Sequence, residues 1–191
     1  MRDSTLVDNY FSAFRKILEN FINDVQNRKS LAKVIEILKG TKRNKRVIYL
    51  VGNGGSSAIA EHMAVDFTKN AGLKAMAISG SPMLTTFSND CGYERVFQKP
   101  LEIFANKKDI LIAISSSGAS KNIINACKAA KNKGMKVITF SGFSSNNPLR
   151  KIGEFNFWVD SCAFGYVEIM HNLLIHYIND AIIGSAEYRI H

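Results

Sequence analysis

The stretch that decides the fold is RVIYLVGNGGSS, residues 46–57. Its first part, Arg46–Val51, is a short apolar run of the kind found in strands that are buried on both faces. The run leads into glycine-rich residues 52–57, and a helical pattern continues from about Ser57 to Asn70. A buried strand that turns through glycines into a helix indicates an α/β sheet.

The same rhythm of strand, loop and helix repeats along the chain. Further helical patterns occupy residues 120–133 and about 163–183. Four more strand candidates lie at Lys74–Ser79, Ile110–Ile114, Lys136–Phe140 and Phe155–Val159. Continuous apolar strands that alternate with helices predict a three-layer α/β fold, in which helices cover both faces of a parallel sheet.

Two helices precede the first strand. Apolar residues recur every three or four positions over residues 4–27, and the pattern repeats from Leu31 to Leu38, with Gly40 expected to end the second helix. We therefore expect one domain over residues 1–191, with an N-terminal helical arm (1–40) and an α/β core (46–191). The apolar stripe of the arm must pack on its own domain or on another subunit.

Composition excludes several classes of protein. The 191 residues carry 25 Lys and Arg against 16 Asp and Glu, a formal net charge of +9. No apolar run approaches the roughly 18 residues of a membrane span, and no apolar signal core opens the chain. Three widely spaced cysteines do not make a disulfide framework, so we expect a cytoplasmic protein. The positive charge leaves nucleic acid, an anionic surface or a phosphorylated small molecule open as partners.

Two strand ends carry residues suited to an anion, and ligands of such sheets bind at these ends. The glycines of residues 52–57 let the backbone approach a ligand at a helix N-terminus. Residues 115–120, Ser-Ser-Ser-Gly-Ala-Ser, offer four hydroxyls at the start of another helix. Each loop alone is also compatible with a plain tight turn or a serine cap. Together they favour a phosphorylated ligand.

Nucleotide ligands are disfavoured. Ser57 breaks the GxGxxG pattern, no acidic residue follows Ser79-Gly80, and no Lys follows the glycines, so we expect no nucleotide cofactor. The densest basic run, residues 42–46, lies at a helix-to-strand connection and is interpreted as a solvated loop. No nucleic-acid-binding motif accompanies it, so nucleic acid is not the expected partner.

Carboxylates and histidines share faces on two of the expected helices. His62 and Asp66 are four residues apart, and Glu168, Asn172 and His176 follow at the same spacing on the last helix. They could supply a general base and a general acid. They could also form a site of two histidines and two carboxylates, whose ligand types suit zinc. A plain surface pair is the alternative for His62 and Asp66.

Taken together, these motifs resemble the sugar isomerase (SIS) domain family, in its phosphoheptose isomerase branch. The resemblance implies a five-stranded parallel sheet of flavodoxin-like type and a homotetramer with active sites at the subunit interfaces. It is carried, in family order, by Gly52–Ser56, His62 with Asp66, Asn89–Glu94, Ile114–Ser120 and Glu168–His176.

The resemblance also implies roles for residues. The reaction would interconvert a ketose phosphate and an aldose phosphate through an enediol, with sedoheptulose 7-phosphate and D-glycero-D-manno-heptose 7-phosphate as the expected pair. Asp66 stands where the family has its catalytic Glu, and His176 where it has its His. Zinc, which some members bind, would be held by His62, Asp66, Glu168 and His176. Substrate contacts would fall on Asn53, Gly54, Gly55, Ser56, Asp90, Ser115, Ser116, Ser117, Ser120 and Glu168.

Three positions depart from the family pattern. Asp66 retracts the catalytic carboxylate by one methylene, and a misplacement of about 1 Å can cost ~10²-fold in rate. Glu168 replaces a Gln and adds a carboxylate, which could strengthen metal binding or raise the pKa of a neighbouring acid by like-charge repulsion. An Arg is missing, with Lys69 one residue before its place. Two alternatives therefore stay open: an isomerase of another sugar phosphate, and a non-catalytic binding protein like the relatives that associate with the bacterial replication initiator.

Overall fold

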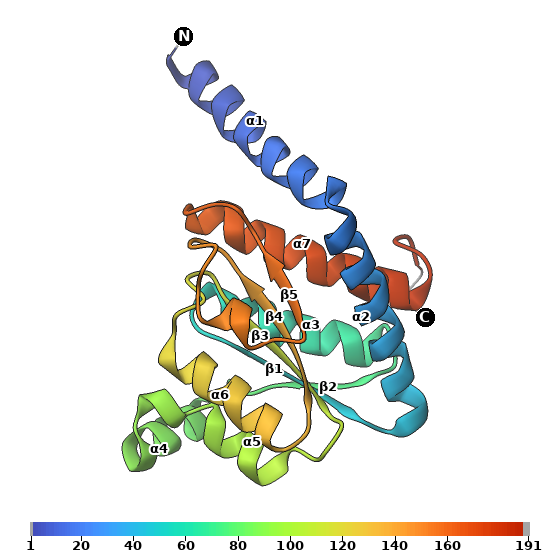
Figure 1. The fold of residues 1–191 in the computed structure, drawn as a ribbon, viewed down its shortest axis with the longest axis vertical. Coiled ribbons are helices and arrows are strands. Elements are labelled where there is room, and N and C mark those ends of the chain that lie inside the picture. The colour runs from blue at the N-terminus through green and yellow to red at the C-terminus, as the bar shows by residue number, and fades with distance from the viewer. Residues whose placement is uncertain (1, 189–191) are drawn as a thin grey trace.

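The computed structural model of the chain describes residues 2–188, and their side chains from residue 5 onward. A parallel sheet lies between two layers of helices, and α1 projects from the body (Figure 1). The elements are α1 (Arg2–Asn23), α2 (Val25–Asn44), β1 (Val47–Gly52), α3 (Gly55–Lys69), β2 (Lys74–Ala77), α4 (Ser81–Cys91), η1 (Tyr93–Arg95), α5 (Gln98–Phe104), β3 (Ile110–Ser115), α6 (Lys121–Asn132), β4 (Lys136–Ser141), η2 (Leu149–Lys151), β5 (Phe155–Trp158) and α7 (Phe164–Ile183).

The sheet confirms the prediction of a parallel, three-layer α/β fold. Its five strands lie in the order β2-β1-β3-β4-β5, and each neighbouring pair is parallel. The chain moves outward in opposite directions from β1 and from β3, so the loops that follow these two strands lie side by side. This switch point is where doubly wound sheets bind their ligands.

Two cores cover the two faces of the sheet. Alternate strand residues point to opposite faces, so Ile48 and Leu50 join one core while Tyr49 and Val51 join the other. The first core is closed by α2, α3 and α7, and the second by α5 and α6. Phe67, Phe140 and Phe157 are the largest of the fully buried side chains in the first core. This packing fixes α3 and α7 against each other over the same face.

The N-terminal arm differs in detail from the expectation. The break between its helices falls at Asp24, whose Oδ1 accepts hydrogen bonds from the backbone N–H of Gln26 at 2.7 Å and of Asn27 at 3.3 Å. The prediction that Gly40 ends the second helix was wrong, because α2 runs on to Asn44. A lone glycine inside a helix costs only about 1 kcal/mol, and the buried Thr41 keeps the helix on the core.

The segment between β2 and β3 held no expected element, yet it forms α4, η1 and α5. In α4 no residue is fully buried, although Met83, Leu84 and Phe87 pack partly on the second core. Of the helices within residues 2–188, none combines the length and the apolar character needed to cross a membrane.

Candidate active site

The glycine loop after β1 is as tight as its sequence indicates. A Cβ on Gly52 would lie 2.4 Å from the carbonyl oxygen of Ser56, so any side chain there would collide with backbone. Gly54 has a φ of +53°, a conformation that glycine adopts without steric cost. Ser56 is 3% exposed and stands in the first turn of α3. The loop therefore presents the N-terminus of α3 at the carboxyl edge of the sheet.

The serine loop after β3, residues 115–120, lies beside it. Ser115 and Ser116 are each 5% exposed, and the two hydroxyl oxygens of Ser115 and Ser120 lie 3.3 Å apart. The hydroxyl of Ser116 is buried and finds no hydrogen-bond partner among residues 2–188. Ser120 is the N-cap of α6, but within the described chain its hydroxyl makes no capping hydrogen bond. These hydroxyls are thus available to a ligand rather than used as helix caps.

Together the two loops form one pocket of about 230 Å³. Its described lining is Asn53, Ser56, Ile114, Ser115, Ser116, Ser117, Ser120, Phe164 and Glu168. No Lys or Arg is among these residues. Hydroxyls at the N-termini of α3 and α6 suit a phosphate, because helix N-termini favour negative charge.

Asn53 is held by two residues to which no sequence motif assigns a role, Asn122 and Tyr93. Its amide pairs reciprocally with that of Asn122, at 3.0 Å from Asn53 Nδ2 to Asn122 Oδ1 and at 2.9 Å in the other direction. The hydroxyl of Tyr93 donates to Asn53 Oδ1 at 2.9 Å. Tyr93 belongs to the quoted stretch Asn89–Glu94, but no local pattern reveals a contact across 40 residues. The network fixes the Asn53 side chain at the pocket.

His62, Asp66 and His176 come together where α3 faces α7. Asp66 Oδ2 lies 3.4 Å from His62 Nε2 and 3.8 Å from His176 Nδ1. Its other oxygen, Oδ1, accepts a hydrogen bond from Asn70 Nδ2 at 3.1 Å. The exposed fractions of the three side chains are 56% for His62, 16% for Asp66 and 34% for His176. One carboxylate oxygen thus stands between two imidazoles.

This donor set fits a metal ion. One ligand atom from each of His62, Asp66 and His176 lies within 4.8 Å of the others. Two imidazoles and one carboxylate are a ligand set that catalytic zinc sites use, with a position left open for water or substrate.

Glu168, which the resemblance also made a metal ligand, lies elsewhere. It lines the pocket of the serine loop, and it is outside the compact metal-binding group found among the described residues. A Cβ on Gly55 would lie 2.6 Å from its carboxylate, so the glycine loop leaves room for Glu168 to reach over it. Glu168 and His176 are eight residues apart on one helix face, about 12 Å at a rise of 1.5 Å per residue.

Asp90 lies on α4, where its Oδ1 accepts a hydrogen bond from Asn89 Nδ2 at 2.8 Å. It is not among the described residues that line the serine-loop pocket. Its contact with a sugar chain stays a prediction.

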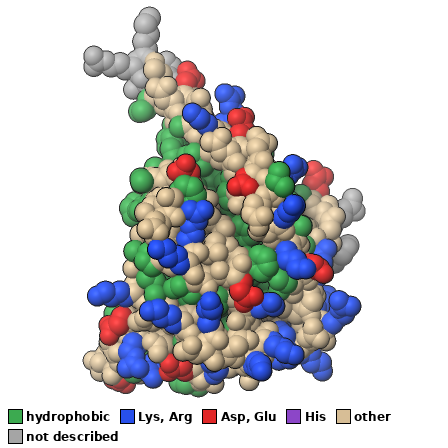
Figure 2. Space-filling model, in the orientation of Figure 1, with side chains coloured by type: hydrophobic (Ala, Val, Ile, Leu, Met, Phe, Trp, Pro, Cys, Tyr) green, Lys and Arg blue, Asp and Glu red, His purple; other side chains and the backbone are tan. Residues whose placement is uncertain are grey.

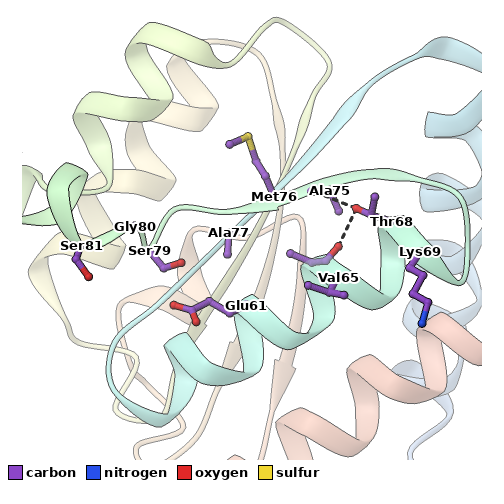
Figure 3. Close-up of a pocket in the computed structure, with 11 residues that line it drawn as sticks. Glu61, Val65, Thr68, Lys69, Ala75, Met76, Ala77, Ser79, Gly80 and Ser81 are labelled. Atoms are coloured by element: carbon purple, nitrogen blue, oxygen red, sulfur yellow. Dashed lines mark hydrogen bonds between the residues drawn. The ribbon is translucent and has the colours of Figure 1, made fainter.

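A larger groove of about 650 Å³ runs along another face of α3, beside the edge strand β2 (Figure 3). Val65 and Met76 line its middle, and Lys69 stands at one end. Its described lining includes none of the residues predicted to bind substrate or to catalyse. Lys69, which stands near the place of the family's arginine, therefore lines a different hollow from the serine-loop pocket.

Comparison with known proteins places this geometry in a family. The model of the SIS domain family matches residues 9–142. The phosphoheptose isomerase of Helicobacter pylori strain P12 is 33% identical over 183 residues, which cover 93% of this chain and 94% of that protein. That of Glaesserella parasuis is 41% identical over 133 residues, covering 67% and 69%.

Solved structures agree with the sequence relatives. The phosphoheptose isomerase of Neisseria gonorrhoeae superposes with a TM-score of 0.86 at 27% identity, over 94% of this chain and 97% of that one. That of Francisella tularensis gives 0.86 at 25% identity, over 95% and 98%. Because the family model covers more than half of the chain and relatives above 30% identity span most of it, the chain belongs to the SIS domain family.

Proposed function

We propose that this protein is a phosphoheptose isomerase, which interconverts sedoheptulose 7-phosphate and D-glycero-D-manno-heptose 7-phosphate. The observation that carries the proposal is that α3 and α7 hold both parts of the site. One end of each helix lines the serine-loop pocket, and the same helices bring Asp66 and His176 together about two to three turns further along. A phosphorylated sugar chain would span from one end to the other. Relatives named phosphoheptose isomerase support the choice of substrate.

The phosphate end binds without cations. The buried Ser116 hydroxyl has no partner within residues 2–188, and the Ser120 hydroxyl leaves its helix uncapped there. Both are therefore donors for phosphate oxygens at the N-terminus of α6. Lys and Arg side chains are scattered over the face seen in Figure 2 rather than gathered into one stripe. The net charge of +9 then supplies a mild field that attracts anions.

At the other end, Asp66 and His176 would move protons. Asp66 takes the proton from C1 of the ketose while the carbonyl oxygen on C2 receives a proton from His176, which yields the enediol. Asp66 then delivers its proton to C2, and the hydroxyl on C1 returns a proton to His176 and becomes the aldehyde oxygen. Positioned acids and bases of this kind contribute about 10²- to 10⁴-fold in rate.

The same three side chains, His62, Asp66 and His176, would hold zinc if the protein binds it. Such an ion would supply Lewis acidity at a sugar oxygen. Asp66 Oδ2 faces both imidazoles while Oδ1 is held by Asn70, so the carboxylate is oriented for one shared position.

We also propose that the chain assembles into a homotetramer. Leu6 and Phe11 of α1 are 70% and 65% exposed, and Leu173 and Tyr177 of α7 are 41% and 50% exposed. Hydrophobic side chains gather below the projecting helix in Figure 2. Exposed apolar surface of this extent marks an interaction site, and Tyr177 adjoins His176, so a second subunit would complete the open side of the site. Light scattering coupled to gel filtration tests this, and a monomeric mass would contradict it.

The deciding experiment is a coupled isomerase assay on sedoheptulose 7-phosphate, with and without added zinc, for the wild type and Asp66→Asn. We expect turnover by the wild type and a loss of at least about 100-fold in the variant, since the amide cannot accept the proton. Glu61→Gln, on another face of the same helix, serves as the matched control and should stay active. Full activity of Asp66→Asn would overturn the mechanism.

The assays with and without zinc distinguish metal binding from direct proton transfer as the role of these side chains. Loss of activity in chelator, restored by zinc, would support a metal requirement, and unchanged activity would support proton transfer by the side chains alone. If the wild type turns over no ketose or aldose phosphate across a panel, the result supports the non-catalytic alternative, and capture of a partner protein becomes its test.

The three unbonded cysteines support the cytoplasmic location expected from the sequence.

A further inference from the structure

We propose that Asn147, which lies outside the pocket, is a positioning residue for phosphate binding, because its side chain packs against the serine loop and fixes the conformation of that loop. The inference rests on the proposed function and deepens it at the phosphate end. Asn147 lies in the loop between β4 and η2, and its side chain is 3% exposed. It is not among the described lining residues of the pocket, so it would act on the phosphate only through the loop.

The amide of Asn147 is locked by its own loop. Nδ2 donates to Ser141 Oγ at 3.1 Å, to the carbonyl of Gly142 at 3.2 Å and to that of Ser144 at 2.9 Å. Oδ1 accepts the backbone N–H of Arg150 at 3.0 Å. A buried amide with both ends satisfied holds one conformation, since any rotation would leave a donor or an acceptor unpaired.

This locked amide lies directly against Gly118, in the middle of the serine loop. A Cβ on Gly118 would be 2.1 Å from Asn147 Oδ1 and 2.3 Å from Asn147 Cγ. Gly118 has a φ of +61°, so the loop both adopts a conformation suited to glycine and packs without a gap on the asparagine. The path of the loop is set by this contact.

Backbone hydrogen bonds tie the two loops together on both sides of that contact. The N–H of Gly142 donates to the carbonyl of Ser116, and the N–H of Leu149 donates to the carbonyl of Gly118, each at 2.9 Å. Residues 142–149 therefore form a platform for residues 116–118, and Asn147 fixes the shape of that platform. Binding groups whose supporting residues are locked keep their geometry, whereas loosely supported ones lose binding strength.

The phosphate-binding hydroxyls sit on this platform, but Asp66 and His176 do not. They belong to α3 and α7 and are held by contacts with each other and with Asn70. Loss of the Asn147 amide should therefore weaken phosphate binding and leave the proton-transfer step intact. A general loss of fold would lower both.

The test measures KM and kcat for sedoheptulose 7-phosphate, together with the inhibition constant of inorganic phosphate, in Asn147→Ala. We expect KM and the phosphate constant to rise about tenfold, as expected for a weakened hydrogen bond to a charged group, with kcat within about threefold of the wild type. Asn146→Ala is the matched control, because Asn146 is the exposed neighbour, and it should leave all three values unchanged.

Gly118→Ala disturbs the same contact from the other side and covers the case in which Asn147→Ala fails to fold. It should raise KM and the phosphate constant in the same direction. Folded variants with unchanged phosphate constants, or with a fall in kcat alone, would overturn the proposal. If the wild type itself shows no isomerase activity, the proposed function fails separately. Calorimetric phosphate binding by the wild type and Asn147→Ala then still decides whether the asparagine positions the loop.

Discussion

The two ends of the candidate active site consist of different chemical groups. The phosphate end consists of hydroxyls and backbone on a loop whose first serines, Ser115 and Ser116, are 5% exposed. The other end consists of three titratable side chains, with exposed fractions of 56%, 16% and 34% for His62, Asp66 and His176. One end is enclosed by neighbouring loops, and the other is open.

Only the open end needs a ligand to complete its contacts. At the phosphate end, the backbone conformation of the serine loop determines where its hydrogen-bond donors lie. Residues 142–149 hold the loop in that conformation. At the other end, the contacts of Asp66 Oδ2 at 3.4 Å and 3.8 Å are longer than good hydrogen bonds of 2.7–3.2 Å. These side chains can close further on an ion or a substrate. We therefore expect substitutions at the open end to change turnover, and those at the enclosed end to change binding or stability.

The largest effect is expected for His176→Gln. Glutamine keeps a polar side chain but cannot exchange a proton with the sugar oxygens, so kcat should fall about 10²- to 10⁴-fold. KM should change little, because the phosphate end is untouched. Steady-state kinetics with sedoheptulose 7-phosphate provide the measurement. Glu61→Gln, on another face of α3, again serves as the control. A variant that keeps its kcat while its KM rises would reverse the assignment of the two ends.

A second histidine of α7, His171, lies on the side of the enclosed end, against Ser141. Its burial predicts a pH effect on the stability of the fold. His171 is completely buried, its Nε2 donates to the carbonyl of Ser141 at 3.2 Å, and burial lowers its pKa from 6.5 to about 4. The unfolded chain takes up the proton near pH 6.5, whereas the folded chain resists it down to about pH 4. Stability is therefore complete above pH 6.5 and is lost as the pH falls toward 4, by up to about 3 kcal/mol.

Urea unfolding of the wild type and His171→Gln at pH 7 and pH 5 measures this effect. Glutamine can still donate to Ser141 but does not titrate, so the wild type should lose more stability than the variant between the two pH values. Carboxylates titrate in both proteins, and the comparison removes their share. Equal losses in the two proteins would show that His171 does not govern acid stability.

The sheet and part of the candidate site could be predicted from the sequence, whereas the contacts made by Asn147 and the helices α4 and α5 could not. The sheet was predictable because short apolar runs such as Ile110–Ile114 have no polar face, as burial on both sides requires. Helical spacing placed His62 with Asp66, but only the packing of α3 on α7 brings His176 to them. Asn147 showed no pattern in the sequence, since a loop asparagine is normally exposed, and its partners are a serine hydroxyl and backbone groups whose positions depend on the folded conformation of the loop. The segment of α4 and α5 lacks a clear apolar period, so its helices were missed.

The smallest effect is expected for Ser120→Ala at the enclosed end. The Ser120 hydroxyl lies 3.3 Å from that of Ser115 and does not cap α6 within the described chain. Its removal should therefore raise KM about tenfold through one lost hydrogen bond to phosphate, with kcat and the unfolding temperature unchanged. Ser145→Ala, in the neighbouring loop, controls for the loss of an exposed hydroxyl. A lower unfolding temperature with an unchanged KM would mean that the hydroxyl stabilises the helix after all, and the enclosed end would then bind phosphate through backbone and the remaining serines alone.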